Sequence, residues 1–197
     1  SLKGDYLEVG PDIGLFTQYC VQNGNFSHYW LFEPNNFVTP KLKRLLKNKN
    51  FTISPIIEKI DKVNKELSTV VMIHVLDHLL EPKKILTKLR AKMKLGGLIL
   101  IVTHDESSIM RKILGWRWPA FCLQHPQLFN YKTTELILNE SGFKVLEQSK
   151  SMNYFEISFL IKNLFWVFGI KIQKLPRWLN VPIGLKLGNI ITIASVA

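Results

Sequence analysis

Residues 6–16 have the sequence YLEVGPDIGLF, and this stretch decides how the chain begins to fold. Its first four residues can fill a short parallel strand that is buried on both faces. Gly10 and Gly14 then allow backbone conformations and close contacts that a Cβ atom would prevent. From Leu15 the pattern predicts a helix, whose N-terminus favours negatively charged or hydrogen-bond-accepting ligand atoms. A strand, a glycine turn and a helix in this order are typical of nucleotide binding in α/β domains.

The spacing of the glycines distinguishes between two kinds of nucleotide. A dinucleotide-binding turn has glycines where this chain has Gly10, Asp12 and Leu15, so only the first position fits. A second pattern, acidic-x-Gly-x-Gly-x-Gly, fits at Glu8, Gly10 and Gly14, with Asp12 in place of the middle glycine. Asp is among the residues that best tolerate a positive φ. The stretch therefore resembles the first motif of class I S-adenosylmethionine-dependent methyltransferases. This resemblance implies that Glu8, Gly10, Asp12 and Gly14 bind the cofactor, and the alternative is a turn without a ligand.

A second acidic residue, Glu33, ends the next predicted strand, residues 29–32. It lies close to the expected spacing of about 20 residues from the glycine turn. A carboxylate at this place can accept hydrogen bonds from the two vicinal hydroxyls of a ribose. The alternative is a carboxylate at the start of a helix, before Pro34. Beside the glycine turn, the ribose interpretation is favoured.

The most specific pattern follows the fourth predicted strand, residues 69–73. The chain has HVLDH at 74–78, EP at 81–82, a predicted helix over 83–93, LGG at 95–97 and an apolar strand over 98–102. The same order and spacing occur in methyltransferases that act on small molecules. The resemblance implies that Ile73 and His74, where the fourth strand ends, contribute to cofactor binding.

The HVLDH segment also resembles a zinc motif with inverted histidine order, in which two histidines share one face of a helix. That motif has Glu where this chain has Asp77, and it needs a helix across both histidines. Here a strand precedes His74, and no third ligand is placed to close a zinc site with His74 and His78. We therefore expect no bound metal.

The resemblance covers about residues 5–150 and the last predicted strand, residues 188–196. It implies an α/β fold of the Rossmann-like class I methyltransferase type, with a doubly wound, mostly parallel seven-stranded sheet. We expect a single domain over residues 1–197, with a helical cap at 152–187 inserted between the last two strands, next to the cleft mouth. Such a long connection exceeds what a hairpin needs. The alternative is that this segment packs on the sheet and lengthens the core.

The implied reaction is in-line attack by an oxygen, nitrogen or carbon nucleophile on the sulfonium methyl group. Because the methyl donor is already activated, the protein mainly aligns the reactants and excludes water. A heteroatom nucleophile can also need a general base. We predict His78 and His125 as catalytic residues, with Asp77 and Tyr154 as further candidates. For each histidine the alternative is a structural role.

The formal net charge of +11 raises the question of a nucleic-acid partner. The excess comes mostly from Lys, whereas Arg is the residue that contacts bases and phosphates bidentately. The chain also lacks the Asn/Asp-Pro-Pro-aromatic segment of exocyclic-amine methyltransferases and a Pro-Cys nucleophile, since Cys122 follows Phe121. We therefore expect no nucleic-acid partner and a small-molecule acceptor, such as a sugar, lipid precursor or secondary metabolite. The alternative is a non-catalytic cofactor-binding or interaction module that retains the fold.

Cys20 and Cys122 predict free thiols in a reducing cytosol, and the start of the chain has no signal-peptide pattern. We therefore expect a cytoplasmic protein. Residues 152–187 combine large apolar side chains with Lys and Arg, which suits an apolar substrate pocket or peripheral contact with an anionic membrane.

Overall fold

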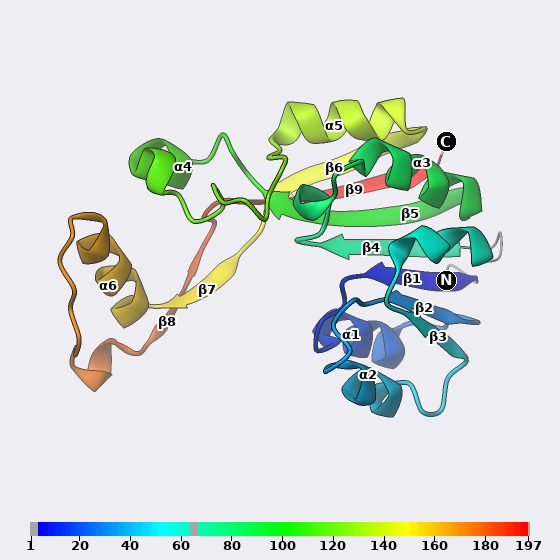
Figure 1. Cartoon of the computed structure of the whole chain (residues 1–197), viewed down its shortest axis with the longest axis horizontal. Helices are drawn as coiled ribbons and strands as arrows, with labels where there is room; N and C mark the ends of the chain where they lie inside the picture. Colours follow the sequence, from blue (N-terminus) through cyan, green and yellow to red (C-terminus); the bar gives the residue numbers. More distant parts are fainter. Residues whose placement is uncertain (1–3, 64–66, 197) are drawn as a thin grey trace.

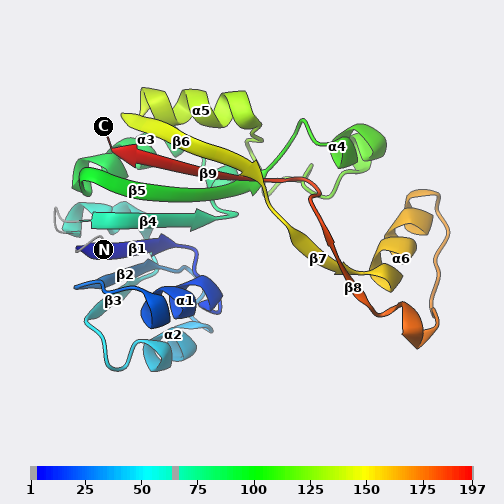
Figure 2. The same cartoon turned by 180° about the vertical axis from the view of Figure 1, so that it is seen from behind.

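The computed structural model describes residues 4–63 and 67–196. Within these residues the main body is a seven-stranded sheet with the order β3-β2-β1-β4-β5-β9-β6 (Figures 1 and 2). Its strands are β1 (Asp5–Val9), β2 (Tyr29–Phe32), β3 (Phe51–Ser54), β4 (Leu67–Ile73), β5 (Met93–His104), β6 (Phe143–Lys150) and β9 (Asn189–Val196). The first five are mutually parallel, and β9 is antiparallel to both of its neighbours. The predicted fold class is confirmed.

Helices lie on both faces of the sheet because successive side chains of each strand point to opposite faces. They are α1 (Leu15–Asn23) and α2 (Thr39–Leu45) on one face, and α3 (Pro82–Lys92) and α5 (Tyr131–Glu140) on the other. Leu42 of α2 is buried with Tyr6 and Leu31 in one core cluster. Leu86 of α3 and Leu138 of α5 are buried with further strand residues in a second cluster. The buried sheet thus holds its carboxyl edge, where β1, β2, β4 and β5 end, in a fixed arrangement.

Residues 152–187 leave the main sheet between β6 and β9, and we call them the arm. They form a two-stranded antiparallel ribbon, β7 (Asn153–Glu156) and β8 (Pro182–Leu185), with α6 (Ile157–Val167) and a 3-10 helix (Arg177–Leu179) between the two strands. The arm extends away from the sheet, and α6 lies at its outer end (Figures 1 and 2). The two strands of this ribbon were not expected from the sequence.

A further short helix, α4 (Ile109–Leu114), lies in the connection between β5 and α5. A 3-10 helix, Gly115–Arg117, follows it directly. Both views place α4 on the side of the molecule to which the arm projects (Figures 1 and 2).

Candidate active site

The turn after β1 has a backbone that glycine adopts most easily. Gly10, Asp12 and Gly14 have φ angles of 66°, 48° and 80°, which lie in the left-handed region. A Cβ atom on Gly10 would lie 2.7 Å from Cγ2 of Val75, and one on Gly14 would lie 2.7 Å from Cδ2 of Leu42. Both glycines therefore suit the backbone conformation of the turn, and a Cβ atom on either would require a neighbouring side chain to shift.

Glu8 is buried beneath this turn and joins β1 to α1. Its carboxylate accepts a hydrogen bond from the hydroxyl of Tyr6 at 2.6 Å and another from the hydroxyl of Thr17 on α1. Burial is the main reason that the pKa of the Glu8 carboxyl is raised; the two hydroxyl donors oppose this rise, and the charge of Glu33 adds to it. Glu8 thus connects the strand before the glycine turn to the helix after it.

Glu33 follows β2 and is also buried. Its Oε2 accepts the backbone N–H of Asp12 at 2.8 Å, and its Oε1 accepts the backbone N–H of Asn35 at 2.8 Å. A carboxylate has about four acceptor positions, so these two bonds leave capacity for a ligand. Glu33 therefore fixes the glycine turn relative to the end of β2.

A groove of about 320 Å³ opens beside the glycine turn. It is lined by Val9, Gly10, Phe32, Pro34, Pro55, Ile57, Val75, His78 and Leu79. Apart from His78 the lining is apolar, which suits a flat aromatic ring. The carboxyl ends of β1 and β2 and the segments after β3 and β4 contribute to it.

Four of the five histidines of the chain gather next to this groove, and we call His74, His78, His104 and His125 the histidine cluster. The ring centroids of His74 and His104 are 4.8 Å apart, those of His104 and His125 are 4.8 Å apart, and those of His78 and His125 are 4.5 Å apart. His74 follows β4 and His104 ends β5, so two parallel strands bring their rings together. Trp118, which is buried, packs edge-on against His104 with centroids 6.1 Å apart.

His74 has an unusual backbone at the end of β4. Its φ angle is 53°, which is uncommon for a residue with a side chain. Its backbone N–H donates to the carbonyl oxygen of Val102 on β5 at 2.8 Å, so the neighbouring strand holds this conformation. Strained residues of this kind occur preferentially at functional sites.

Asp77 is completely buried below the histidine cluster and forms a hydrogen bond with Nδ1 of His104. Burial by itself raises the pKa of the Asp77 carboxyl, but the hydrogen bond and the electrostatic interaction with His104 outweigh burial and lower this pKa. Burial lowers the pKa of the His74 imidazole, and His104 lowers it further. Oδ1 of Asp77 and Nδ1 of His74 are buried without a hydrogen-bond partner among the described residues.

His78 and His125 are oriented by backbone carbonyl groups. Nδ1 of His78 lies 2.9 Å from the carbonyl oxygen of Gln124, and Nδ1 of His125 lies 2.7 Å from that of Ala120. Because a carbonyl oxygen only accepts hydrogen bonds, Nδ1 carries the proton in each ring. Nε2 is then the acceptor atom of both side chains.

The residues singled out in the sequence lie in two adjacent groups. Glu8, Gly10, Asp12, Gly14 and Glu33 form the glycine turn and its supports. His74 and the two catalytic candidates belong to the histidine cluster, and Ile73 is the last residue of β4 before it.

One member of the histidine cluster, His104, was not predicted as a site residue. Its only signal in the sequence is its position at the end of the fifth strand, at the carboxyl edge where α/β sheets bind ligands. Trp116, two residues before Trp118 in the chain, is largely exposed.

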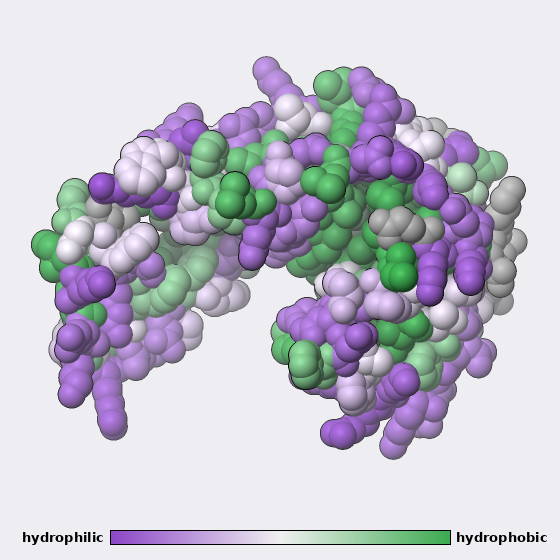
Figure 3. Space-filling model, in the orientation of Figure 1, coloured by the Kyte–Doolittle hydropathy of each residue, from purple (hydrophilic) through white to green (hydrophobic). Residues whose placement is uncertain are grey.

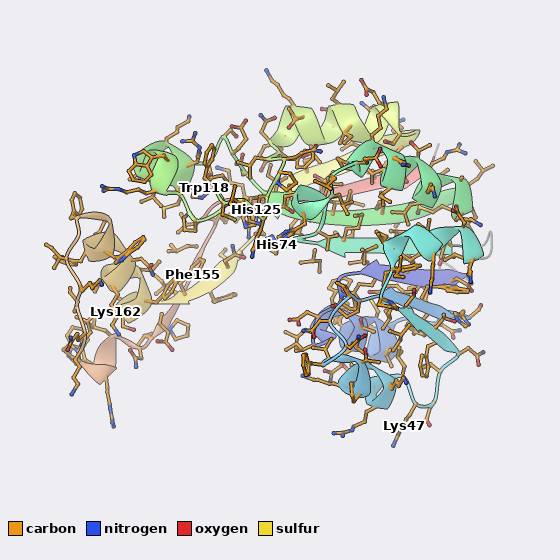
Figure 4. All side chains as sticks on the ribbon, in the orientation of Figure 1. Lys47, His74, Trp118, His125, Phe155 and Lys162 are labelled. Atoms are coloured by element: carbon orange, nitrogen blue, oxygen red, sulfur yellow. The ribbon has the colours of Figure 1, made fainter. Side chains whose placement is uncertain are left out.

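The histidine cluster lies at the root of the arm. His74 and His125 are seen there with Trp118 beside them, and Phe155 lies further out on β7 (Figure 4). The surface is hollowed between the arm and the part of the molecule that carries α1 and α2 (Figure 3).

Solved structures that share this fold include several methyltransferases. A methyltransferase from Archaeoglobus fulgidus that depends on S-adenosylmethionine superposes with a TM-score of 0.63 at 19% identity, over 98% of this chain and 86% of that one. A methyltransferase of the same kind from Methanosarcina mazei superposes with a TM-score of 0.61 at 10% identity, over 99% of this chain and 93% of that one. The N-methyltransferase NodS from Bradyrhizobium japonicum, solved with S-adenosyl-L-homocysteine, gives 0.61 at 11% identity, over 98% and 78%. No curated protein matches the chain in sequence.

The fold and the glycine turn define a class I S-adenosylmethionine-dependent methyltransferase. The sequence matches a family model described as a methyltransferase domain over residues 1–148. The match spans most of the chain, so the protein belongs to this methyltransferase family and its cofactor is S-adenosylmethionine. The glycine turn without Cβ atoms, the apolar groove and the Glu33 carboxylate fit that cofactor.

Proposed function

We propose that the protein transfers a methyl group to a small-molecule acceptor, such as a sugar, lipid precursor or secondary metabolite, bound next to the histidine cluster. The single observation that carries this proposal is the position of His78, which lines the apolar groove and also contacts His125. A cofactor in the groove and an acceptor on the histidine cluster would therefore be neighbours.

We infer how this chain's residues would hold the cofactor. The apolar groove would hold the adenine ring, and Glu33 would accept hydrogen bonds from the ribose with its remaining acceptor positions. Gly10, Asp12 and Gly14 would bring the turn close to the methionine part, and Glu8 would support the turn from below. Ile73 and His74 would contact the cofactor from the end of β4. When bound, S-adenosylmethionine supplies an activated methyl group on a sulfonium.

His78 and His125 are the proposed catalytic residues. Each has Nδ1 directed at a backbone carbonyl, so that Nε2 can accept a hydrogen bond from the hydroxyl or amine of an acceptor. His125 would orient the nucleophile and take up its proton as the methyl group is transferred. His78 would do the same from the cofactor side.

The direct test uses methyl-labelled S-adenosylmethionine and cell extract separated into aqueous and lipid fractions. We expect label in one fraction after incubation with the protein, and much less label with a Gly10→Ala variant, whose added Cβ atom would crowd the glycine turn. Cofactor binding is followed separately by the thermal shift that S-adenosylhomocysteine causes. A protein that binds this ligand but labels neither fraction would contradict the proposal.

The arm supports a more specific proposal about the acceptor. Exposed large apolar side chains gather on it: Tyr154, Phe159, Leu164, Phe165, Trp166, Phe168, Ile170, Trp178 and Val181. A helix that is apolar nearly all round is normally buried, but α6 is exposed over most of its length. We infer that a surface outside the described residues covers α6 when the protein acts.

The charges of the arm favour an anionic membrane as this covering surface. Its basic residues are Lys162, Lys171, Lys174, Arg177 and Lys186, against Glu156 as its acidic residue. Aromatic and basic residues together are typical of segments that lie in a membrane interface. Among the described residues no helix is long and apolar enough to span a membrane.

We therefore propose that the arm contacts the membrane peripherally and that the acceptor is presented there, in keeping with a lipid precursor. Ile109 and Ile113 of α4, with Arg111 and Lys112, offer the same combination of apolar and basic groups on the same side of the molecule. In this arrangement the protein is cytoplasmic and binds the membrane surface through the arm. The arm would then cap the acceptor site from the membrane side.

A further inference from the structure

We propose that His74, Asp77 and His104 bind a divalent transition-metal cation. Each of the three residues offers one ligand atom, and these atoms lie within 4.8 Å of one another. Two imidazoles and a carboxylate are a ligand set that zinc and iron(II) share in catalytic sites. Oxygen-preferring cations such as Mg²⁺ and Ca²⁺ suit this set poorly, because two of its three ligands are nitrogen atoms.

Two buried polar atoms in this set point to a missing ligand. Asp77 is fully buried, and its Oδ1 has no hydrogen-bond partner among the described residues. Nδ1 of His74 is buried and unpaired in the same way. Unpaired buried polar atoms are rare and costly. A cation bound by the three residues would balance the charge of the buried Asp77 carboxylate and would offer a partner to polar atoms that have none.

The backbone holds the three side chains in place without the cation. His74 and His104 stand at the ends of the paired strands β4 and β5, and the N–H of His74 is fixed to the carbonyl of Val102. Asp77 sits in the short 3-10 helix after β4. Around them, Trp118 packs against His104, and the amide of Asn189 lies 3.5 Å from Nε2 of His74. Such outer contacts orient metal-binding histidines.

The proposed cation would deepen the function of this site, and this part rests on the proposed methyl transfer. Three protein ligands leave a coordination position open. A hydroxyl of the acceptor bound at that position would lose its proton more easily and would be oriented towards the cofactor. His125, which touches His104, stands where it can receive that proton.

From the sequence we expected no bound metal, because only His74 and His78 were candidate ligands there. In the structure the three ligands are His74, Asp77 and His104, and His104 lies far from the other two in the chain. The proposal therefore depends on a residue that the zinc motif does not contain.

The experiment measures zinc binding to the full chain after removal of any histidine tag and treatment with a chelator. Zn²⁺ is titrated in calorimetry, and Co²⁺ is added as a spectroscopic probe. We expect one ion per chain and a visible ligand-field absorption with Co²⁺. His104→Asn should weaken Zn²⁺ binding at least about 100-fold. Loss of a group that only supports a metal ligand already weakens binding by up to about 100-fold, and His104 is proposed as a ligand itself.

The matched control is His28→Asn, because His28 is the one histidine outside the histidine cluster and pairs with Thr52 at the far end of β2. It should bind Zn²⁺ as the parent does. Asp77→Asn serves as a second ligand variant, and His74→Asn replaces it if the protein does not fold. Absence of zinc binding by the parent, or equal binding by His104→Asn, would overturn the proposal.

Failure of the metal site can be separated from failure of the methyltransferase assignment. The thermal shift with S-adenosylhomocysteine is recorded in the presence of chelator, where no cation is bound. If the thermal shift is retained but zinc does not bind, only the metal site is overturned. If the chelated parent shows no thermal shift, the proposed cofactor site is overturned instead.

Discussion

The side chain of Glu33 is bonded to the backbone of Asp12: Oε2 accepts the N–H of Asp12 at 2.8 Å. Glu33 follows β2 and Asp12 belongs to the turn after β1, so this bond joins the two carboxyl ends at which the cofactor is expected. The same carboxylate also accepts the N–H of Asn35. The residue proposed to hold the ribose is therefore also a support of the glycine turn.

We expect Glu33→Ala to weaken S-adenosylhomocysteine binding by about 1.5–3 kcal/mol, the range for hydrogen bonds to a charged group. The fold should persist, because the core of the sheet is untouched, although loss of the two backbone bonds will lower the free energy of unfolding. Calorimetry and chemical unfolding measure the two effects. Glu33→Gln, which keeps one acceptor oxygen, should lie between the parent and the alanine variant. Unchanged affinity in both variants would show that the ribose is bound elsewhere.

Gly10→Ala should lower the stability of the protein more than Gly96→Ala does. Both glycines have positive φ angles, 66° and 71°, so both variants carry a backbone cost of about 1–2 kcal/mol. A Cβ at residue 10 meets Val75 at 2.7 Å, whereas nothing lies within 4 Å of one at residue 96. We expect Gly10→Ala to cost a further 1–3 kcal/mol or so from overpacking and to weaken S-adenosylhomocysteine. Equal stability and affinity of the two variants would refute the close contact.

Glu8 should make the protein less stable as the pH rises. Burial raises the pKa of this carboxyl in the folded state, above about 4.3 in the unfolded chain. The folded state therefore holds the proton more tightly, and the stability from this proton is lost as pH rises through the window between the two pKa values. Glu8→Gln should remove this loss in unfolding experiments over a pH series.

Asp61→Asn is a control in which the dependence of stability on pH has the opposite sign. The hydrogen bond from Lys88 lowers the pKa of the Asp61 carboxyl, so Asp61 contributes stability that is lost as pH falls. Parallel pH profiles of the parent and Glu8→Gln would be at odds with the raised pKa.

His125→Gln should lower kcat by about 10²–10⁴-fold, the range for loss of a general base, and leave S-adenosylhomocysteine affinity unchanged. His78→Gln should lower kcat and also weaken the cofactor, because His78 lines the apolar groove. Both are measured with the extract fraction that accepts label, and His28→Gln is the control. Full activity of His125→Gln would leave this histidine with a structural role.

The arm should bind anionic vesicles. Replacing Phe165 and Trp166, which are 39% and 58% exposed, by Ala should abolish vesicle binding and leave cofactor affinity unchanged. If these side chains instead belonged to a buried core, the double change would cost several kcal/mol of stability, about 3–5 for each large residue. Sedimentation with vesicles and thermal unfolding distinguish the two.

Charge provides a second, matched comparison on the arm. Lys162 lies on α6 and Lys47 at the opposite end of the molecule, and both are exposed (Figure 4). Lys162→Glu should weaken binding to anionic vesicles by at least about 1 kcal/mol, the contribution of one basic residue near the surface, and Lys47→Glu should not. Equal effects of the two changes, or binding to neutral vesicles alone, would exclude docking through the arm.

Local patterns in the sequence were sufficient to predict the fold and the position of the glycine turn. The strands β1, β2 and β4 are short and mostly apolar, and Gly10 and Gly14 lie between β1 and α1, so local patterns are sufficient to place these elements. The segment from His74 to Val102 keeps the order and spacing of the methyltransferase family, and the predicted seven-stranded sheet followed from it. These features depend on residues that are close in the chain, whose conformations the sequence constrains directly.

The tertiary structure alone decided the contents of the histidine cluster and the exposure of the arm. His104 reaches His74 and Asp77 only because β4 and β5 are neighbours in the sheet, and Glu33 reaches Asp12 only because β1 and β2 are. No spacing rule connects such residues, since each distance depends on strand pairing. Likewise, the apolar sequence of α6 is compatible with a helix that packs on the sheet and with a helix that lies away from it. Only the ribbon of β7 and β8, which carries α6 away from the sheet, shows that α6 lies outside the core of the sheet.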